Sequence, residues 1–223
     1  MRKELIFAVS ALIFLSGCEN GNLFSWTHSA GSNKSVDALL ADGINAERNK
    51  DYDDAIKFFD DVLSKQPGNS EALYGKASSE LKNAGLDIAS LIPQLINQDT
   101  GAAEDLLSNI LAGNLLLATE EAGPALKKIA DGRADGAIPS DDFDINLNLG
   151  IIYFLHAASL LSQDPGVSVK NNFTVDGTPT RATINKAIEN IDNAIKYLNA
   201  AMGGGLGGVK ANFESFKTEL ETL

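Results

Sequence analysis

The chain has 223 residues, of which 18 are Lys or Arg and 30 are Asp or Glu, so its formal net charge is -12. Its single cysteine excludes an intrachain disulfide. A chain this acidic repels phosphate backbones, and no Lys/Arg cluster breaks the pattern, so nucleic-acid binding is not expected. The length suits one helical domain or repeat array with a sizeable buried core.

The first residues have the pattern of a secretory leader. Arg2 and Lys3 form a short basic start, and the apolar run Leu5 to Leu15 ends in two small residues. As a helix this run rises only about 16 Å, roughly half of the hydrocarbon core of a bilayer, so it is too short to span a membrane. We therefore expect residues 1–17 to be a signal peptide that is removed.

The cysteine follows this leader directly. Leu15-Ser16-Gly17-Cys18 resembles the lipobox of bacterial lipoproteins. The resemblance implies cleavage before Cys18, a diacylglycerol on its thiol and a fatty acid such as palmitate on its amino group, which together anchor the protein to a membrane. Glu19 stands where lipoproteins retained in the inner membrane tend to have Asp, which favours the periplasmic face of the outer membrane. Residues 18–35, rich in Asn, Ser and Gly, are expected to be a lipidated tether. The alternative is an ordinary leader that happens to contain a cysteine.

Residues 36–69 contain two segments whose apolar residues recur at the three- and four-residue spacing of amphipathic helices. Gly43 in the first segment, Ala55 and Phe59 in the second, and Pro67 after it resemble the small residue, the Ala-x3-Phe pair and the closing proline of a tetratricopeptide (TPR) repeat. The resemblance implies a helical hairpin in which the small residues let the helices approach. Phe59 would fill the gap between this hairpin and the next.

The pattern weakens towards the C-terminus. A second unit is expected at residues 70–98, where Pro93 delays or kinks the second helix. Residues 102–119 and 124–131 are expected to form a further helical pair, and residues 163–180, rich in Gly, Pro, Asn and Thr, an inserted loop.

These segments together predict the fold class. We expect residues 36–223 to form an all-α, TPR-like array of helical hairpins (an α-solenoid) that is degenerate in its C-terminal half. The apolar stretch 147–161 is expected to be the central core helix of this domain. The alternative, a membrane span, is disfavoured by its shortness and by Asn148 and His156 within it.

Residue types that carry catalysis or bind transition metals are scarce. His28 and His156 are the two histidines, and with an acylated cysteine they cannot assemble a Cys/His nucleophile or a His-rich metal site. We therefore expect no enzyme and no cofactor beyond the covalent lipid, and we interpret His156 as a core or groove residue bonded to a neighbouring helix. Residues 131–142 have Asp at positions 1, 5 and 12 of a calcium-loop pattern, but Arg133 replaces the oxygen ligand at position 3. A solvated acidic linker is expected there, with calcium binding as the alternative.

The TPR resemblance also implies where a ligand would lie, against the first helix of each hairpin. The candidate groove on that face consists of Leu40, Ile44, Glu47, Tyr74, Ser78 and Leu81. Leu40 and Ile44 stand where chaperone-binding members have the Lys and Asn that grip a carboxylate, so the groove should favour apolar segments.

Two functions are compatible with these features. The first is a lipid-anchored protein–protein interaction module or assembly scaffold for an unidentified envelope protein. The alternative is similar to the T component of TRAP transporters, a lipoprotein that binds or channels a small solute and docks on a solute-binding protein. An enclosed cavity of roughly several hundred Å³ would favour the second.

Overall fold

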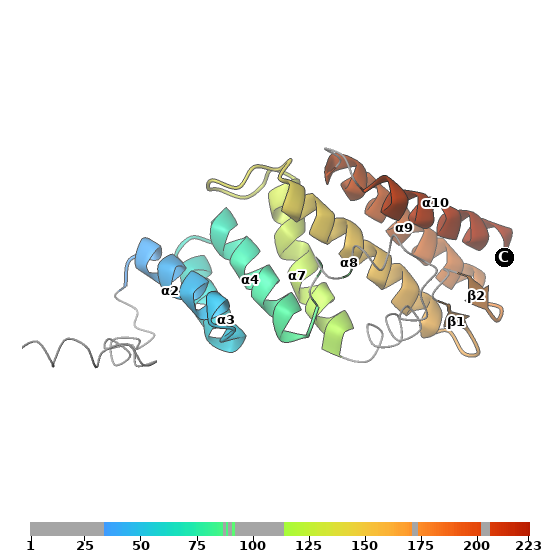
Figure 1. The fold of residues 1–223 in the computed structure, drawn as a ribbon, viewed down its shortest axis with the longest axis horizontal. Coiled ribbons are helices and arrows are strands. Elements are labelled where there is room, and N and C mark those ends of the chain that lie inside the picture. The colour runs from blue at the N-terminus through green and yellow to red at the C-terminus, as the bar shows by residue number, and fades with distance from the viewer. Residues whose placement is uncertain (1–33, 87, 89–90, 92–113, 171–173, 202–205) are drawn as a thin grey trace, which may run out of the picture. The chain divides into compact units, whose positions relative to one another are not determined.

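The computed structural model describes residues 34–86, 88, 91, 114–170, 174–201 and 206–223. The predicted leader, Cys18, nearly all of the tether, Pro93 and residues 102–113 lie outside the described residues. The described residues form seven helices and one short β-hairpin (Figure 1). The elements are α2 (Val36–Arg48), α3 (Tyr52–Lys65), α4 (Ser70–Asn83), α7 (Asn114–Ala130), α8 (Phe143–Ser162), β1 (Ser168–Val169), β2 (Val175–Asp176), α9 (Arg181–Ala201) and α10 (Gly207–Thr222).

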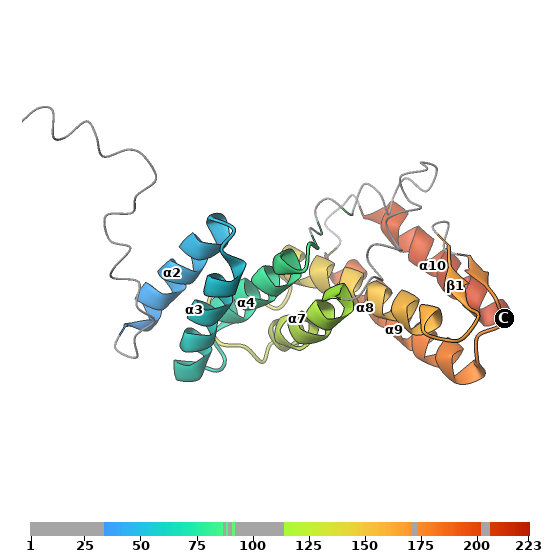
Figure 2. The same ribbon diagram turned by 90° about the horizontal axis from the view of Figure 1, so that it is seen from below.

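Each described helix packs against the next one along the chain, from α2 on α3 to α9 on α10 (Figure 1). The expectation of an all-α fold is confirmed, because the hairpin β1–β2 is the only strand pair in the described part of the chain. Its two antiparallel strands are two residues long and lie within the 163–180 segment between α8 and α9. Strand β1 also contacts α8 (Figure 2).

An aromatic side chain joins the first three helices. Phe59 of α3 is only 1% exposed. A Cβ atom added to Gly43 of α2 would lie 2.8 Å from Cε1 of Phe59, and one added to Gly75 of α4 would overlap the same ring. The ring therefore fits because both neighbouring helices have glycine at the contact. The role predicted for Phe59 between hairpins agrees with this packing, whereas Gly75 was not predicted to take part.

Helix α7 corrects the predicted break between residues 119 and 124. It runs without interruption from Asn114 to Ala130 and contains Pro124. A proline inside a helix is unfavourable partly because its ring crowds the Cβ of the preceding residue, and Gly123 has no Cβ. Burial of Leu126 and Ile129, each 1% exposed, holds the second half of the helix against the core.

Helix α8 is the central helix of the core. Ile151, Phe154 and Leu161 have no exposed surface, and the ring of Phe154 stacks on Phe213 of α10 with 4.2 Å between centroids. A Cβ on Gly150 would lie 2.9 Å from Leu198 of α9, so this glycine allows the two helices to approach closely. By length and composition α8 could cross a membrane, and 72% of its apolar window is buried inside the domain. Packing against α7, α9 and α10 accounts for its apolar sequence.

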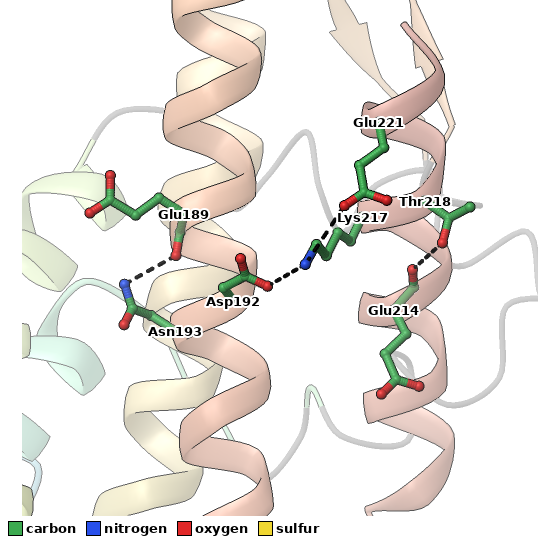
Figure 3. A network of polar contacts seen from close by, with 7 residues as sticks. All are labelled: Glu189, Asp192, Asn193, Glu214, Lys217, Thr218 and Glu221. Carbon is green, nitrogen blue, oxygen red and sulfur yellow. Dashed lines mark hydrogen bonds and ion pairs between the residues drawn. The ribbon is translucent and has the colours of Figure 1, made fainter.

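The outer face of α9 and α10 carries a polar network (Figure 3). Lys217 of α10 donates to Asp192 of α9 at 2.7 Å and lies 3.7 Å from Glu221. Asn193 donates to the backbone carbonyl of Glu189 within α9 at 3.0 Å. Because the carboxylates of Asp192 and Glu221 are solvent-exposed, each ion pair contributes at most about 1 kcal/mol. The buried aromatic residues beneath them hold α10 more strongly.

The acidic segment 131–142 between α7 and α8 is fixed to the turn before α4. The backbone N–H of Asp135 donates to the carbonyl of Gly68, and the N–H of Ser70 donates to the carbonyl of Asp135, both at 2.6 Å. The N–H of Ile138 donates to the hydroxyl of Ser70 at 3.2 Å. The segment is largely exposed, as expected for a solvated linker, but its backbone is bound to a distant part of the chain.

Candidate binding cleft

A half-open cleft of about 370 Å³ lies between α4, the residues just after it, and the start of α8. This volume is within the range of natural binding clefts, roughly 300 to 1,000 Å³. The lining consists of Tyr74, Ser78, Leu81 and Lys82 of α4, of Leu86 and Ile88, and of Phe143, Asp144, Leu147 and Asn148 of α8.

One face of α4 supplies the first wall. Tyr74, Ser78 and Lys82 follow one another at intervals of four residues, which places them on the same side of a helix. Leu81, on the same side, and Leu86, just after the helix, are each 3% exposed. This wall therefore combines an aromatic ring and a hydroxyl with a buried aliphatic base.

The first two turns of α8 supply the second wall. The carboxylate of Asp142 accepts a hydrogen bond from the backbone N–H of Ile145 at 3.1 Å and caps the helix. Phe143 is therefore the first helical residue, and its ring is left 45% exposed. Leu147, one turn later, is only 6% exposed. An exposed aromatic ring and a buried leucine thus line the same side of the cleft.

Glu47 of α2 is hydrogen-bonded to two polar residues that line the cleft. Its Oε1 accepts hydrogen bonds from the hydroxyl of Ser78 and from Nζ of Lys82, each at 2.7 Å. The charge of Lys82 is therefore compensated within the protein.

The environment of Tyr74 shows the electrostatic character of the cleft. Burial raises the pKa of Tyr74 to about 12, and the nearby carboxylates of Asp144, Glu47 and Asp142 add to this rise. A phenol with such a pKa is protonated at physiological pH and can donate a hydrogen bond to a ligand. The three carboxylates make the local potential negative.

The cleft contains part of the groove predicted from the repeat pattern. The structure brings together three of them in the cleft: Tyr74, Ser78 and Leu81. Glu47 joins these through its bond to Ser78. Leu40 is half-buried against the core cluster of α2, α3 and α4, and Ile44 is 40% exposed on α2. Neither of these two residues lines the cleft.

The α8 wall was missed by reasoning from sequence. Asp142 followed by an apolar helix is a recognisable helix start, so the sequence could indicate that Phe143 opens a helix. It could not indicate that this helix start lies beside α4, because the docking of the 131–142 segment depends on hydrogen bonds between residues more than sixty positions apart. An aromatic residue at an exposed first position of a helix was the available hint.

Two other candidates identified in the sequence have structural explanations. Nε2 of His156 lies 2.9 Å from the hydroxyl of Thr119 on α7, which confirms the interpretation of a histidine bonded to a neighbouring helix. Burial lowers the pKa of His156, against an opposing effect of Glu120, so the ring is neutral at pH 7.

Two of the three Asp residues of the calcium-loop pattern are engaged elsewhere. Asp131 accepts from Lys127 at 2.6 Å and from Arg133; the bond from Lys127 is the main cause of its lowered pKa. Asp142 caps α8. Within the described ranges, no group of three or more His, Cys, Asp or Glu side chains is placed to hold a metal ion.

No protein-family model, curated protein or solved structure matches this chain. The fold and the cleft therefore have to be interpreted from their own chemistry. The chain is a mostly helical protein. It has an apolar cleft between α4 and the start of α8, and carboxylates border this cleft.

Proposed function

We propose that this chain is a lipid-anchored protein of the bacterial envelope whose TPR-like helical domain binds a segment of another envelope protein. One observation carries the binding part of the proposal. Three residues predicted from the repeat pattern to face a ligand line an apolar cleft, together with the exposed ring of Phe143. A partly exposed aromatic ring beside buried aliphatic side chains is typical of a protein-binding hot spot.

The packing of α2, α3 and α4 supports the TPR-like description. A large aromatic residue of α3 lies between glycines on the helices before and after it, as the repeat pattern requires of neighbouring hairpins. After α4 the resemblance is weaker, since α8 and α9 are longer helices joined through a β-hairpin segment. The first three helices are therefore the repeat-like part, and the later helices complete the cleft and the core.

The anchor is supported by the sequence Leu15-Ser16-Gly17-Cys18 alone. Metabolic labelling with a palmitate analogue, followed by mass spectrometry of the mature N-terminus, tests it. The expected result is a label on Cys18 and no residue before it, with the protein in the outer-membrane fraction. A label-free protein that retains residues 1–17, or one cut at another position, would contradict the lipid anchor. Cys18→Ala is the control and should abolish labelling.

Binding at the cleft is tested by crosslinking and affinity purification from the cell envelope. Tyr74→Ala combined with Phe143→Ser removes the two aromatic rings that line the cleft and should reduce recovery of specific partners at least about tenfold, as for two hot-spot residues. Leu117→Ser is the matched control, because it removes another exposed apolar side chain, on α7, that lies outside both the cleft and the predicted groove. Equal recovery with both variants and the wild type would refute the cleft as the binding surface.

The volume of the cleft favours one second candidate, a carrier of a small apolar solute in the manner of the TRAP-associated T component. A volume of about 370 Å³ would accommodate such a ligand. The cleft is half open and includes only the first turns of the long apolar helix, which favours a peptide over an enclosed solute. Native mass spectrometry of the purified protein separates the two functions. A bound small molecule that is lost in Tyr74→Ala would support the carrier.

A further inference from the structure

The cleft has an uncompensated negative charge at one end. Among the residues that the structure describes, no Lys or Arg forms an ion pair with Asp142 or Asp144. The cation that lines the cleft, Lys82, is 2.7 Å from Glu47 and is neutralised by it. Within the described part of the chain, a ligand therefore meets an apolar floor with carboxylates beside it and no unpaired Lys or Arg in the lining.

Both carboxylates lie at the start of a helix, and stabilisation of that helix accounts for Asp142. Acidic groups stabilise the N-terminus of a helix, and Asp142 uses one oxygen for the cap. Asp144 lies in the first turn of the same helix but is not its cap. Its side chain lines the cleft, is exposed, and raises the pKa of the half-buried Tyr74 through its charge. The negative potential of Asp144 is thus directed at the site that a ligand would occupy.

From this arrangement we infer that the cleft selects a partner segment in which an apolar anchor residue is flanked by Lys or Arg. This inference rests on the protein-binding function proposed above. The apolar anchor would bury against Leu81 and Leu147, which are 3% and 6% exposed and have no polar side-chain atoms. The neighbouring cation would lie beside Asp144, where the amide oxygen of Asn148 can accept a second bond.

The same charges exclude other occupants. An acidic residue beside the anchor would face the carboxylates of Asp142 and Asp144, both of which act on Tyr74. A second copy of this chain is disfavoured because each copy has a net charge of -12. A basic segment of a different protein is the occupant that complements both the apolar and the charged part of the cleft.

Selection from a random-peptide display library on the intact protein tests this inference. Peptides that bind wild type but not Tyr74→Ala are cleft-dependent, and we expect Lys and Arg beside their apolar anchor to be enriched about threefold, the size expected for an exposed ion pair. Asp144→Asn should remove most of the enrichment. Asp141→Asn is the matched control, since it removes the same charge from an exposed neighbour that does not line the cleft, and it should leave the enrichment intact.

The outcomes separate this inference from the function on which it rests. Cleft-dependent peptides without basic enrichment, or with enrichment that survives Asp144→Asn, would overturn the charge selection and leave the binding function standing. A selection with no cleft-dependent peptides would overturn both. For a selected peptide, replacing its basic residue by Glu should weaken binding in a fluorescence anisotropy titration about tenfold, which corresponds to about 1.4 kcal/mol.

Discussion

Glu80 of α4 is an acidic side chain that the fold holds in an unfavourable place. It is only 8% exposed, and among the described residues nothing donates a hydrogen bond to its Oε2. Its other oxygen is 3.7 Å from Lys76, whose closer partner is Asp60 at 2.6 Å. Burial raises the pKa of Glu80 from 4.5 to about 7; Lys76 opposes this rise, and the charges of Glu121 and Asp60 add to it. The substitution Glu80→Gln tests this picture.

The size and sign of the effect follow from linkage between protonation and folding. The folded state binds the proton more tightly than the unfolded state, so the stability contributed by Glu80 is complete below pH 4.5 and is lost as the pH rises through 7. Each unit of pKa is 1.36 kcal/mol, so the full loss is about 3 kcal/mol. Glu80→Gln cannot ionise, and its free energy of unfolding should therefore exceed that of wild type by about 3 kcal/mol more at pH 8 than at pH 4.

Urea denaturation at pH values from 4 to 8 measures this difference. Other groups, such as the buried His156, titrate in both proteins and cancel in the comparison of the two curves. Glu214→Gln is the control, because Glu214 is 53% exposed and its loss should change stability by less than about 0.5 kcal/mol at every pH. If the curves of wild type and Glu80→Gln run parallel between pH 4.5 and 7.5, the reasoning about Glu80 is wrong.

Three further predictions concern packing, the docked acidic segment and metal binding. Gly75→Ala should destabilise the domain by about 1 to 3 kcal/mol in urea denaturation, since its methyl group would overlap the ring of Phe59, whereas Gly207→Ala, with open space around it, should not destabilise it. Ser70→Ala should cost about 1 to 2 kcal/mol by removing the acceptor for the N–H of Ile138, and unchanged amide exchange of the 131–142 segment would contradict this. Calorimetry with millimolar calcium should show no binding heat, because Asp131 and Asp142 already have partners and Arg133 occupies a ligand position of the loop pattern; a saturable heat would contradict this.

Local patterns in the sequence were sufficient to predict much of the helical architecture. The apolar spacing of residues 36–65 predicts two helices, and the Gly43 and Phe59 contact follows from their repeat-like positions. The apolar stretch 147–161 lies within α8, the helix with the most complete burial in the core. Pro124 misled the prediction because part of its cost depends on the residue before it, and Gly123 has no Cβ for the proline ring to crowd.

Only one of the two walls of the cleft could be predicted from the sequence. Tyr74, Ser78 and Leu81 follow from the face of one helix, which is a local property. Phe143 and Asp144 come to the same place through hydrogen bonds between the 131–142 segment and the start of α4, and apolar spacing contains no information on such bonds. The groove predicted across α2 and α4 therefore included Leu40 and Ile44 and omitted the wall that α8 provides.

The bonds that fix the 131–142 segment also bear on how the chain folds. In an ideal solenoid each repeat touches only its neighbours, so folding can proceed unit by unit. Here the N–H of Ala137 reaches the carboxylate of Glu71 across 66 residues, and Asn69 pairs with Asp135 in an isolated parallel bridge. A fragment that ends before α7 would leave these acceptors at the start of α4 without their donors. Long-range closure of this kind slows folding but couples the early helices to the late ones, so we expect the domain to unfold as one cooperative unit.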